Sequence, residues 1–352
     1  MPALPQADLD AIFNSTQALW EELRGQRIFV TGGTGFFGAW LLESFLQANE
    51  RLQLKAEMLV LTRDPKSFAA KFPHLAASSA IKFLIGDVRS FEFPSGQFPY
   101  VIHAATEASV KLNVENPQLM SDVVVNGTRR ALEFAKQAGV KKFLLTSSGA
   151  VYGRQPTEVT HLPEDFSYKP SAGDPVSAYG DGKRKAEVLC SQFAAENGFE
   201  AKIARCFAFV GPHLPLDTHY AMGNFIRDAL RGGPIQVNGD GTPFRSYLYA
   251  ADLTIWLWTI LFKGKSGRPY NVGSDQVVSI SDVADLVAAS VNGISSIAVQ
   301  VKEKAIPGKA AERYVPSIRR ATDELGLHVQ VDLAEGIRRT ASWYSPAFIP
   351  KG

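Results

Sequence analysis

The sequence predicts an α/β protein with a doubly wound parallel sheet and a smaller α/β lobe toward the C-terminus. Between residues 27 and 207, short apolar runs alternate with longer stretches of helical periodicity, which is typical of a sheet covered by helices on both faces. After residue 208 the alternation loosens into turns and loops rich in proline and glycine. This change indicates a second, smaller lobe.

The elements of this pattern follow one another in order. Residues 8–23 form an extension before the first strand, and a helical repeat places its apolar side chains near one face: Leu9, Ile12, Phe13, Leu19, Trp20 and Leu23. Strands are predicted at residues 27–30, 57–61, 81–85, 100–103, 142–146 and 201–207. The main helices are predicted at residues 39–48, 117–138 and 178–196.

The composition excludes several classes of protein. The 352 residues include 37 basic and 35 acidic side chains, and this net charge of +2 is too balanced for a nucleic-acid-binding surface. The most apolar stretch, residues 253–262, has about half the length that spans a bilayer, and the N-terminus lacks the order of a signal peptide. Cys190 and Cys206 have neither metal nor redox spacing. We therefore expect a soluble, cytoplasmic protein with no membrane or nucleic-acid partner and no metal site.

A glycine-rich turn lies directly after the first strand, in the segment TGGTGFFG at residues 31–38. Gly32 permits a tight turn, Gly35 lets the backbone approach a pyrophosphate, and Gly38 lets the next helix pack close to the strand. The pyrophosphate would then meet N–H groups at the start of that helix. Because the motif follows a strand and opens a helix, it predicts a Rossmann-type dinucleotide site.

The end of the second strand leaves the choice of dinucleotide open. An acidic residue there binds the ribose hydroxyls of NAD, whereas a nearby arginine suits the 2′-phosphate of NADP. Thr62 occupies the position expected for the acid and Arg63 follows it, while Asp64 serves if the strand ends later. NAD is the first expectation, and NADP stays possible.

A second group of polar residues lies at the same edge of the predicted sheet. The fifth strand runs into Ser147 and Ser148. Further along the chain, Tyr179 and Lys183 share one face at the start of a helix because they are four residues apart. Folds of this kind bind their ligands at the carboxyl ends of the strands. This placement, rather than the Tyr–Lys spacing alone, indicates a catalytic group.

Ordered matches along the chain after residue 26 extend the pattern. Besides the glycine loop and the Tyr–Lys pair, they are Gly86-Asp87-Val88, His103-Ala104-Ala105, Asn126-Gly127-Thr128, Val151-Tyr152-Gly153, Gly211-Pro212, Gly239-Asp240-Gly241, Arg245-Ser246-Tyr247, Ala251-Asp252 and Tyr270-Asn271-Val272-Gly273. On these motifs the chain resembles an extended short-chain dehydrogenase/reductase of the nucleotide-sugar epimerase/dehydratase kind.

The resemblance implies an NAD(P)-dependent enzyme with a defined division of the chain. A helical extension at residues 1–25 precedes an NAD(P)-binding domain at 26–207, which is rejoined by about 247–275. A substrate-binding lobe comprises 208–246 and 276–352. The resemblance also implies a homodimer, formed through the helices at about 112–138 and 178–196.

The resemblance assigns a role to each candidate residue. Tyr179 is the acid/base for the sugar hydroxyl, Lys183 favours its phenolate, and Ser148 holds the same sugar oxygen, with Ser147 as the rival for that role. Substrate contacts are expected from Ser148, Asn224 and Arg245, of which Arg245 clamps the pyrophosphate. Cofactor contacts are expected from Gly32, Thr34, Gly35, Phe36, Phe37, Gly38, Arg63, Asp87, Val88, Ala104, Ala105, Thr106, Tyr179 and Lys183.

The residues at the end of the fifth strand bear on the reaction. The dehydratases of the family carry Thr-Asp-Glu there and the decarboxylases keep the Glu, whereas this chain has Ser148-Gly149-Ala150. Small residues resemble the epimerases, which remove a hydride from the sugar, usually at C4, and return it. An epimerase is therefore expected. The departure at Ala208, where the family often has Asn, removes one expected contact to the substrate diphosphate.

Three alternatives stay open. A dehydratase would need another acid, and Glu107 lies just past the fourth strand. An NADPH-dependent ketoreductase would suit Arg63. A dinucleotide sensor without chemistry would need none of the Ser, Tyr and Lys side chains, so their presence argues against it.

Overall fold

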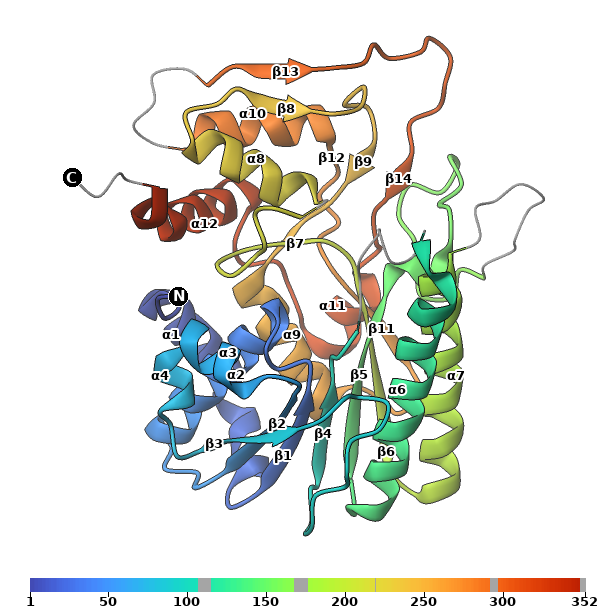
Figure 1. Ribbon diagram of the computed structural model, residues 1–352. Helices are drawn as coiled ribbons and strands as arrows, with labels where there is room; N and C mark the ends of the chain where they lie inside the picture. The colour runs from blue at the N-terminus through green and yellow to red at the C-terminus, as the bar shows by residue number, and fades with distance from the viewer. Residues whose placement is uncertain (107–114, 168–176, 219, 292–296, 349–352) are drawn as a thin grey trace. The chain divides into compact units, whose positions relative to one another are not determined.

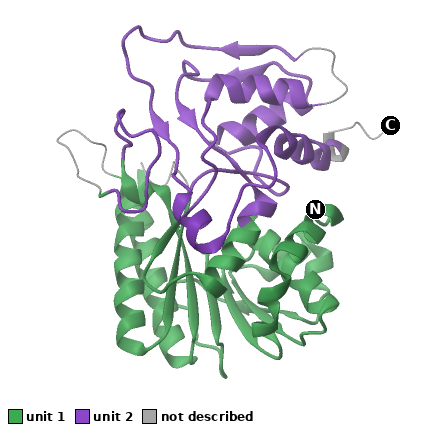
Figure 2. Ribbon diagram, turned by 180° about the vertical axis from the view of Figure 1, so that it is seen from behind, with its two compact units in different colours: residues 1–153, 167–206, 254–270 green, residues 154–166, 207–253, 271–352 purple. Residues whose placement is uncertain are grey.

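A computed structural model describes residues 1–106, 115–167, 177–218, 220–291 and 297–348. Figure 2 shows the two compact units into which the chain divides. Unit 1 comprises residues 1–153, 167–206 and 254–270. Unit 2 comprises residues 154–166, 207–253 and 271–352. The N-terminal extension therefore belongs to unit 1, and the short segment 154–166 belongs to unit 2.

Unit 1 is built around a seven-stranded sheet with the strand order β11-β6-β5-β4-β1-β2-β3 (Figure 1). The strands are β1 (Arg27–Thr31), β2 (Glu57–Thr62), β3 (Ile81–Ile85), β4 (Tyr100–His103), β5 (Lys142–Ser148), β6 (Glu200–Cys206) and β11 (Pro269–Val272). The pairings from β3 across to β6 are parallel, with Thr31 opposite both Leu61 and His103. The strand order reverses at β1, where sheets of this type bind their ligands. The predicted doubly wound α/β fold is confirmed.

One face of the sheet is covered by α6 (Pro117–Gln137) and α7 (Ala178–Asn197). Phe29 of β1 and Phe143 of β5 point to this face and pack in one buried cluster with apolar side chains of both helices. Neighbouring residues along a strand point to opposite faces, so the sheet needs a second covering layer.

The opposite face is covered by α2 (Phe36–Arg51) and α9 (Ala250–Lys263) (Figure 1). Trp258 of α9 donates its Nε1–H to Ser44 Oγ of α2 at 3.0 Å. The ring of Trp20, from the N-terminal extension, lies 4.7 Å from that of Trp258. The extension therefore completes the layer on this side.

The extension differs from the single helix expected over residues 8–23. It divides into α1 (Gln6–Thr16) and the 3₁₀ helix η1 (Gln17–Leu23). Thr16 Oγ1 donates to a carbonyl one turn earlier at 2.6 Å and accepts from Trp20 Nε1 at 2.9 Å. A side chain that bonds the backbone in this way competes with helix continuation. The predicted apolar face is nevertheless buried along its whole length.

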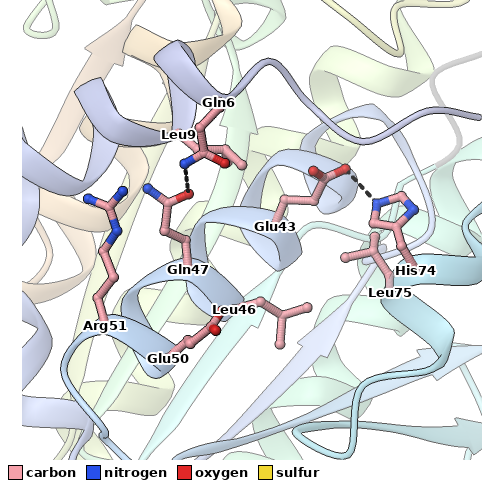
Figure 3. Close-up of a pocket in the computed structure, with 9 residues that line it drawn as sticks. All are labelled: Gln6, Leu9, Glu43, Leu46, Gln47, Glu50, Arg51, His74 and Leu75. Carbon is pink, nitrogen blue, oxygen red and sulfur yellow. Dashed lines mark hydrogen bonds and ion pairs between the residues drawn. The ribbon is translucent and has the colours of Figure 1, made fainter.

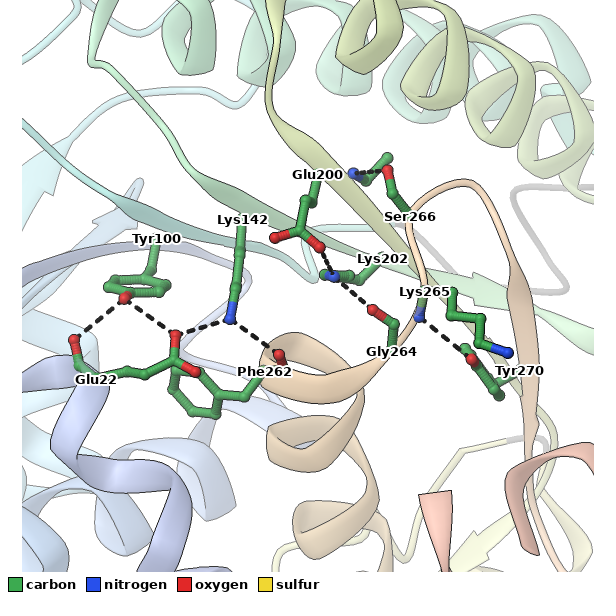
Figure 4. A network of polar contacts seen from close by, with 11 residues as sticks. Glu22, Tyr100, Lys142, Glu200, Lys202, Phe262, Gly264, Lys265, Ser266 and Tyr270 are labelled. Atoms are coloured by element: carbon green, nitrogen blue, oxygen red, sulfur yellow. Dashed lines mark hydrogen bonds and ion pairs between the residues drawn. The ribbon is translucent and has the colours of Figure 1, made fainter. Parts of the chain in front are cut away.

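A polar network joins the amino ends of the strands to the extension and to α9 (Figure 4). Lys142 of β5 donates to Glu22 Oε2 of η1 at 2.7 Å and to a carbonyl in the last turn of α9 at 2.9 Å. Tyr100 of β4 donates to Glu22 O at 3.1 Å, and Lys202 of β6 donates to Gly264 O. These contacts fasten the amino edge of the sheet, and sheets of this type bind their ligands at the opposite, carboxyl edge.

Unit 2 combines helices with three small sheets. The helices α8 (Ala221–Leu230), α10 (Ile280–Ser290) and α12 (Leu333–Phe348) pack on one another. The sheets are ordered β10-β7, β12-β9-β14 and β13-β8. Their strands are β7 (Phe209–Val210), β8 (Ile235–Val237), β9 (Phe244–Arg245), β10 (Leu248–Tyr249), β12 (Val278–Ser279), β13 (Val299–Val301) and β14 (Arg313–Tyr314). Within the described ranges, no helix is both long and apolar enough to cross a membrane.

Candidate functional site

The glycine loop joins β1 to α2 and passes very close to the segment that follows β4. Gly32 has a φ of +73°, a left-handed conformation that favours glycine. A Cβ atom at Gly32 would lie 2.4 to 2.5 Å from backbone atoms of Ala104 and Ala105. Glycine is therefore required at residue 32 both for the turn and for the close approach of the two strand ends.

Gly35 is the N-cap of α2, and no side chain caps this helix end. Among the described residues, a Cβ atom at Gly35 would meet only Gly32 O, at 3.6 Å, so these residues leave room beside it. Phe36 and Phe37 begin the helix, with ring centroids 5.8 Å apart. The start of such a helix attracts a phosphate because its first N–H groups have no partner within the helix.

Gly38 allows a close approach at the start of α2. A Cβ atom there would lie 2.2 Å from the carbonyl carbon and oxygen of Gly33, so the nearest contact of the helix at this residue is the loop backbone directly after the strand. The sequence pattern does not single out Gly33, yet a Cβ atom there would lie 2.7 Å from Val60 Cγ1 on β2. Each of these glycines allows a contact that a larger residue would prevent.

His103, the last residue of β4, is buried and bonded at both ring nitrogens. Thr128 Oγ1 donates its proton to a carbonyl of its own helix at 2.7 Å. It must therefore be the acceptor in its 3.1 Å hydrogen bond with His103 Nε2. Thr31 Oγ1 donates to His103 Nδ1 at 2.8 Å and accepts from Ala105 N at 3.1 Å. Burial, with the charge of Lys183 as the second cause, lowers the pKa of His103 to about 3 and keeps the ring neutral. This network fixes the chain after β4 beside the glycine loop.

The next residue of that segment suits a dinucleotide. Thr106 Oγ1 is buried and has no hydrogen-bond partner among the described residues. It follows Ala104 and Ala105, whose backbone touches Gly32. An unpartnered hydroxyl, an uncapped helix start and a loop open at Gly35 together fit the pyrophosphate of a bound NAD.

The two serines at the end of β5 have different partners. Ser147 Oγ donates to the carboxylate of Glu187 on α7. Ser148 Oγ accepts from Ala150 N at 3.2 Å and so caps the 3₁₀ helix η2 (Gly149–Tyr152). Since that bond uses a lone pair, the Ser148 hydroxyl proton remains available for a ligand. Ser147, by contrast, is already committed as a donor.

Tyr179 and Lys183 lie in the first two turns of α7. Lys183 is 3% exposed, and its Nζ donates to Thr146 O at 2.8 Å, two residues before Ser148. The same Nζ lies 5.7 Å from the centroid of the Tyr179 ring. Burial lowers the pKa of Lys183 to about 8, although Cys206 and Glu187 raise it through charge. The structure therefore places a buried cation between the end of β5 and the tyrosine.

A buried ion pair that the sequence did not reveal lies one turn beyond Lys183. Glu187 accepts from Arg205 of β6 at 2.7, 3.0 and 3.2 Å, and the two side chains are 10% and 14% exposed. Arg205 Nη1 also donates to the hydroxyl of Tyr152 at 2.9 Å. With the bond from Ser147, the pair joins α7 to β5, β6 and η2. The spacing of four residues between Lys183 and Glu187, which places both on one face of α7, was the available signal.

Asp87 and Val88, two of the expected cofactor contacts, lie after β3. Arg89 Nε donates to Asp87 Oδ1 at 2.8 Å, and Arg89 Nη1 donates to Asp122 Oδ2 of α6 at 3.1 Å. The hydrogen bonds from Arg89, with a smaller contribution from the charge of Arg63, hold the pKa of Asp87 below its usual value. Val88 packs against the buried cluster under α6. Arg89, which the sequence did not single out, fixes the loop that carries Asp87.

The two expected substrate-binding residues, Asn224 and Arg245, lie in unit 2. Asn224 is in the first turn of α8, and its Oδ1 accepts from Arg227 Nη1 at 2.8 Å. Arg245 ends β9, the central strand of its small sheet, and its Nη1 donates to Phe244 O at 2.8 Å. Glu107, the alternative acid, lies outside the described residues.

A hollow of about 550 Å³ lies on unit 1 (Figure 3). Its lining comes from α1, α2 and α4 (Pro73–Ala76) and comprises Gln6, Leu9, Glu43, Leu46, Gln47, Glu50, Arg51, His74 and Leu75. The Glu43 carboxylate there is occupied, since it accepts from Leu4 N at 2.7 Å and contacts His74 Nε2 at 3.1 Å. No residue of the glycine loop or of the catalytic group lines it, so we assign this hollow to the packing of the extension.

Comparison with known proteins identifies the family. Residues 28–273 match the model of the NAD dependent epimerase/dehydratase family. The chain is 30% identical over 319 residues to UDP-glucuronic acid decarboxylase 1 of Arabidopsis thaliana, covering 90% of this chain and 69% of that protein. It is 26% identical over 321 residues to dTDP-glucose 4,6-dehydratase of Streptomyces antibioticus, covering 90% and 92%.

Solved structures agree with the sequence relatives. The UDP-glucose 4-epimerase of Thermus thermophilus, solved in complex with NAD, aligns with a TM-score of 0.73 at 26% identity and covers 92% of this chain and 100% of its own. The motifs, the sheet order and the family match lead to one conclusion. The chain belongs to the NAD-dependent epimerase/dehydratase family of nucleotide-sugar enzymes.

Proposed function

We propose that this protein is a nucleotide-sugar epimerase that inverts a carbon of the sugar, with C4 as the first expectation. The observation that carries the proposal is the composition of the site at the end of β5. Ser148, Tyr179 and Lys183 are present, whereas Gly149 and Ala150 occupy the positions where the resemblance places the acids of the dehydratases. The chain thus has residues for moving a hydride and a proton but lacks these acids for eliminating water.

In this mechanism the Tyr179 phenolate takes the proton of the sugar hydroxyl. A free phenol has a pKa of about 10, so it needs a neighbouring positive charge to act as a phenolate base at neutral pH. Lys183 supplies that charge, with its Nζ 5.7 Å from the centroid of the Tyr179 ring. One of its three N–H groups is used by Thr146 O. Ser148 donates its hydroxyl proton to the same sugar oxygen and holds it in place.

When bound, NAD would supply the redox chemistry of the reaction, which is the reversible uptake of a hydride from the sugar carbon. The uncapped start of α2, the open loop at Gly35 and the Thr106 hydroxyl would hold its pyrophosphate. In unit 2, Arg245 would bind the diphosphate of the substrate and Asn224 would contribute a second polar contact. We also expect a homodimer, located in the reducing cytoplasm. Light scattering of the purified protein measures the oligomeric state.

A decarboxylase is the second candidate, because the chain is 30% identical to a UDP-glucuronic acid decarboxylase. Ala150 argues against it, since the resemblance places a Glu at this position in the decarboxylases. A dehydratase and an NADPH-dependent ketoreductase rank behind both.

The mass of the product separates these candidates. The protein is incubated with UDP- and dTDP-hexoses, UDP-glucuronic acid and a 4-keto nucleotide sugar, in separate reactions with NAD and with NADPH. The products are analysed by mass spectrometry and NMR. An epimerase leaves the mass unchanged, a dehydratase removes one water, a decarboxylase removes carbon dioxide, and a ketoreductase consumes NADPH. Loss of carbon dioxide or water would overturn the proposal.

Matched variants link the activity to the site. Tyr179→Phe and Ser148→Ala should each lower kcat by about 10²- to 10⁴-fold, the usual contribution of a proton-transfer group. Ser147→Ala should keep kcat within about tenfold of the wild type, because Ser147 bonds Glu187 and not the substrate. A larger loss in Ser147→Ala than in Ser148→Ala would assign the role to the other serine.

A further inference from the structure

The 3₁₀ helix η2 lies between the two parts of the catalytic group. Its start is capped by Ser148, whose Oγ accepts from Ala150 N at 3.2 Å. It also contacts α7, the helix whose first two turns carry Tyr179 and Lys183. The packing of α7 on this turn therefore bears on the distance between Ser148 and Tyr179.

Three contacts hold η2 in place. Ala150 O accepts from Gly153 N at 3.1 Å, which closes the turn. The Tyr152 side chain is 1% exposed, and its hydroxyl accepts from Arg205 Nη1 of β6 at 2.9 Å. The cap from Ser148 fastens the turn to β5. Because β5 and β6 are paired in the central sheet, η2 moves only if the sheet edge moves with it.

Gly180, the residue after Tyr179, allows α7 to approach η2 closely. A Cβ atom at Gly180 would lie 2.6 Å from Ala150 O. That oxygen belongs to the backbone of a fixed turn, so it cannot rotate away as the end of a side chain would. Ordinary contact begins at 3.4 Å, so a larger residue would displace the start of α7 by about 0.8 Å. The φ of Gly180 is not left-handed, so the approach alone requires glycine.

Arg184 makes a second link between α7 and η2. It lies one turn after Gly180, and its Nη1 donates to Val151 O at 2.7 Å. Its guanidinium also donates to Asp181 of the same helix. A charged donor makes a stronger hydrogen bond than a neutral one. Gly180 thus permits the approach of the helix to the turn, and Arg184 holds the helix there.

We propose that Gly180 and Arg184 are positioning residues, which hold the tyrosine of the catalytic group at a fixed distance from the end of β5. The inference rests on the proposed function, in which Tyr179 and Ser148 bond one sugar oxygen, and it holds whichever reaction of the family follows. Tyr179 and Lys183 share one helix, so a displaced α7 carries both and keeps their separation. Displacement therefore slows the reaction without changing the charge beside the phenol.

Gly180→Ala tests the close approach, with a nucleotide sugar that the protein converts. We expect kcat to fall by about 10- to 100-fold, because a misplacement of about 1 Å costs about a hundredfold. KM and the affinity for NAD, the latter measured by calorimetry, should stay within about threefold of the wild type. The midpoint of the pH dependence of kcat should not move, since Tyr179 and Lys183 shift together.

Gly182→Ala is the matched control, because it makes the same substitution two residues later in α7. A Cβ atom there would lie 3.3 Å from the side chain of Val124 on α6, which can adjust because it is not backbone. Alanine favours a helix more than glycine does, so neither substitution weakens α7 itself. We expect the kcat of Gly182→Ala to stay within about threefold of the wild type. An equal loss of kcat in both variants would overturn the role of Gly180.

Arg184→Met tests the second link and decides the question if Gly180→Ala does not fold. The variant keeps the apolar part of the side chain and loses the bond to Val151 O. We expect kcat to fall by about three- to tenfold at an unchanged KM, the usual net worth of one hydrogen bond. Lys185→Met, at an exposed position of the same helix, should keep the wild-type kcat. Equal effects of Arg184→Met and Lys185→Met would overturn the role of Arg184.

Tyr179→Phe separates this inference from the proposed function. A wild-type kcat in Gly180→Ala, when Tyr179→Phe is inactive, would overturn the positioning role alone. A shifted pH midpoint in Gly180→Ala would also overturn it, because the loss would then come from the charge beside the phenol. Full activity of Tyr179→Phe would overturn the proposed function and this inference with it.

Discussion

Replacing the carboxylate of Glu187 by an amide should destabilise unit 1, although the side chain keeps its shape. Glu187→Gln keeps the size of the side chain but leaves Arg205 as an uncompensated buried cation. The pair has three hydrogen bonds of 2.7, 3.0 and 3.2 Å, and its side chains are only 10% and 14% exposed. Breaking a buried pair from one side costs about 3–5 kcal/mol. Because the amide oxygen of Gln still accepts one bond, we expect about 3 kcal/mol, at the lower end of that range.

The free energy of unfolding is measured in urea at pH 7 for the wild type, Glu187→Gln and two references. Glu196→Gln, an exposed residue on the same helix, should change the free energy by less than about 0.5 kcal/mol. Glu187→Met/Arg205→Met removes both charges and should recover most of the lost stability. A loss below about 1 kcal/mol in Glu187→Gln, or a double variant less stable than the single one, would refute the ion pair as described.

Three further predictions concern other parts of unit 1. Lys183 has a pKa lowered to about 8 by burial, against 10.5 when unfolded, so the folded state loses this proton first as the pH rises. Between pH 7 and pH 10, the free energy of unfolding in urea should therefore rise by about 2–3 kcal/mol more in the wild type than in Lys183→Met. The same pH dependence of this free energy in both proteins would contradict the burial of the charge. Gly38→Ala places a Cβ 2.2 Å from the Gly33 carbonyl, so dinucleotide affinity should fall by about tenfold or more in calorimetry, and unchanged affinity would contradict the close contact. Glu22→Ala should cost less than about 1 kcal/mol in urea, because the Glu22 side chain is 44% exposed, and a larger loss would assign the amino-edge network a greater role in stability.

The order of strands and helices was predictable because it depends on periodic burial. The central strands have short apolar runs, such as residues 28–30 of β1 and 58–61 of β2, and the turn at Gly32 has a backbone requirement that only glycine meets readily. The same holds for Tyr179 and Lys183, whose spacing of four residues fixes their shared face once the helix is known. Such features depend on local sequence alone.

Other features depend on contacts between distant segments and could not be read from the sequence. Glu187 and Arg205 look like ordinary charged residues, and only the fold buries them together with Ser147. The nearest steric partner of Gly38 is Gly33, five residues earlier in the same loop. The end of α1 follows from a hydrogen bond of the Thr16 side chain, which competes with helical periodicity.

Retention of an isotope distinguishes the return of a hydride from the other reactions of this family. A nucleotide sugar that the panel identifies as a substrate is labelled with deuterium at C4 and converted in ordinary water. We predict an epimer of unchanged mass that keeps the deuterium at C4, with conversion abolished in Tyr179→Phe, because the hydride leaves the sugar and returns to the same carbon. A product that has lost the label, water or carbon dioxide would contradict the proposed mechanism, as would conversion that does not depend on Tyr179.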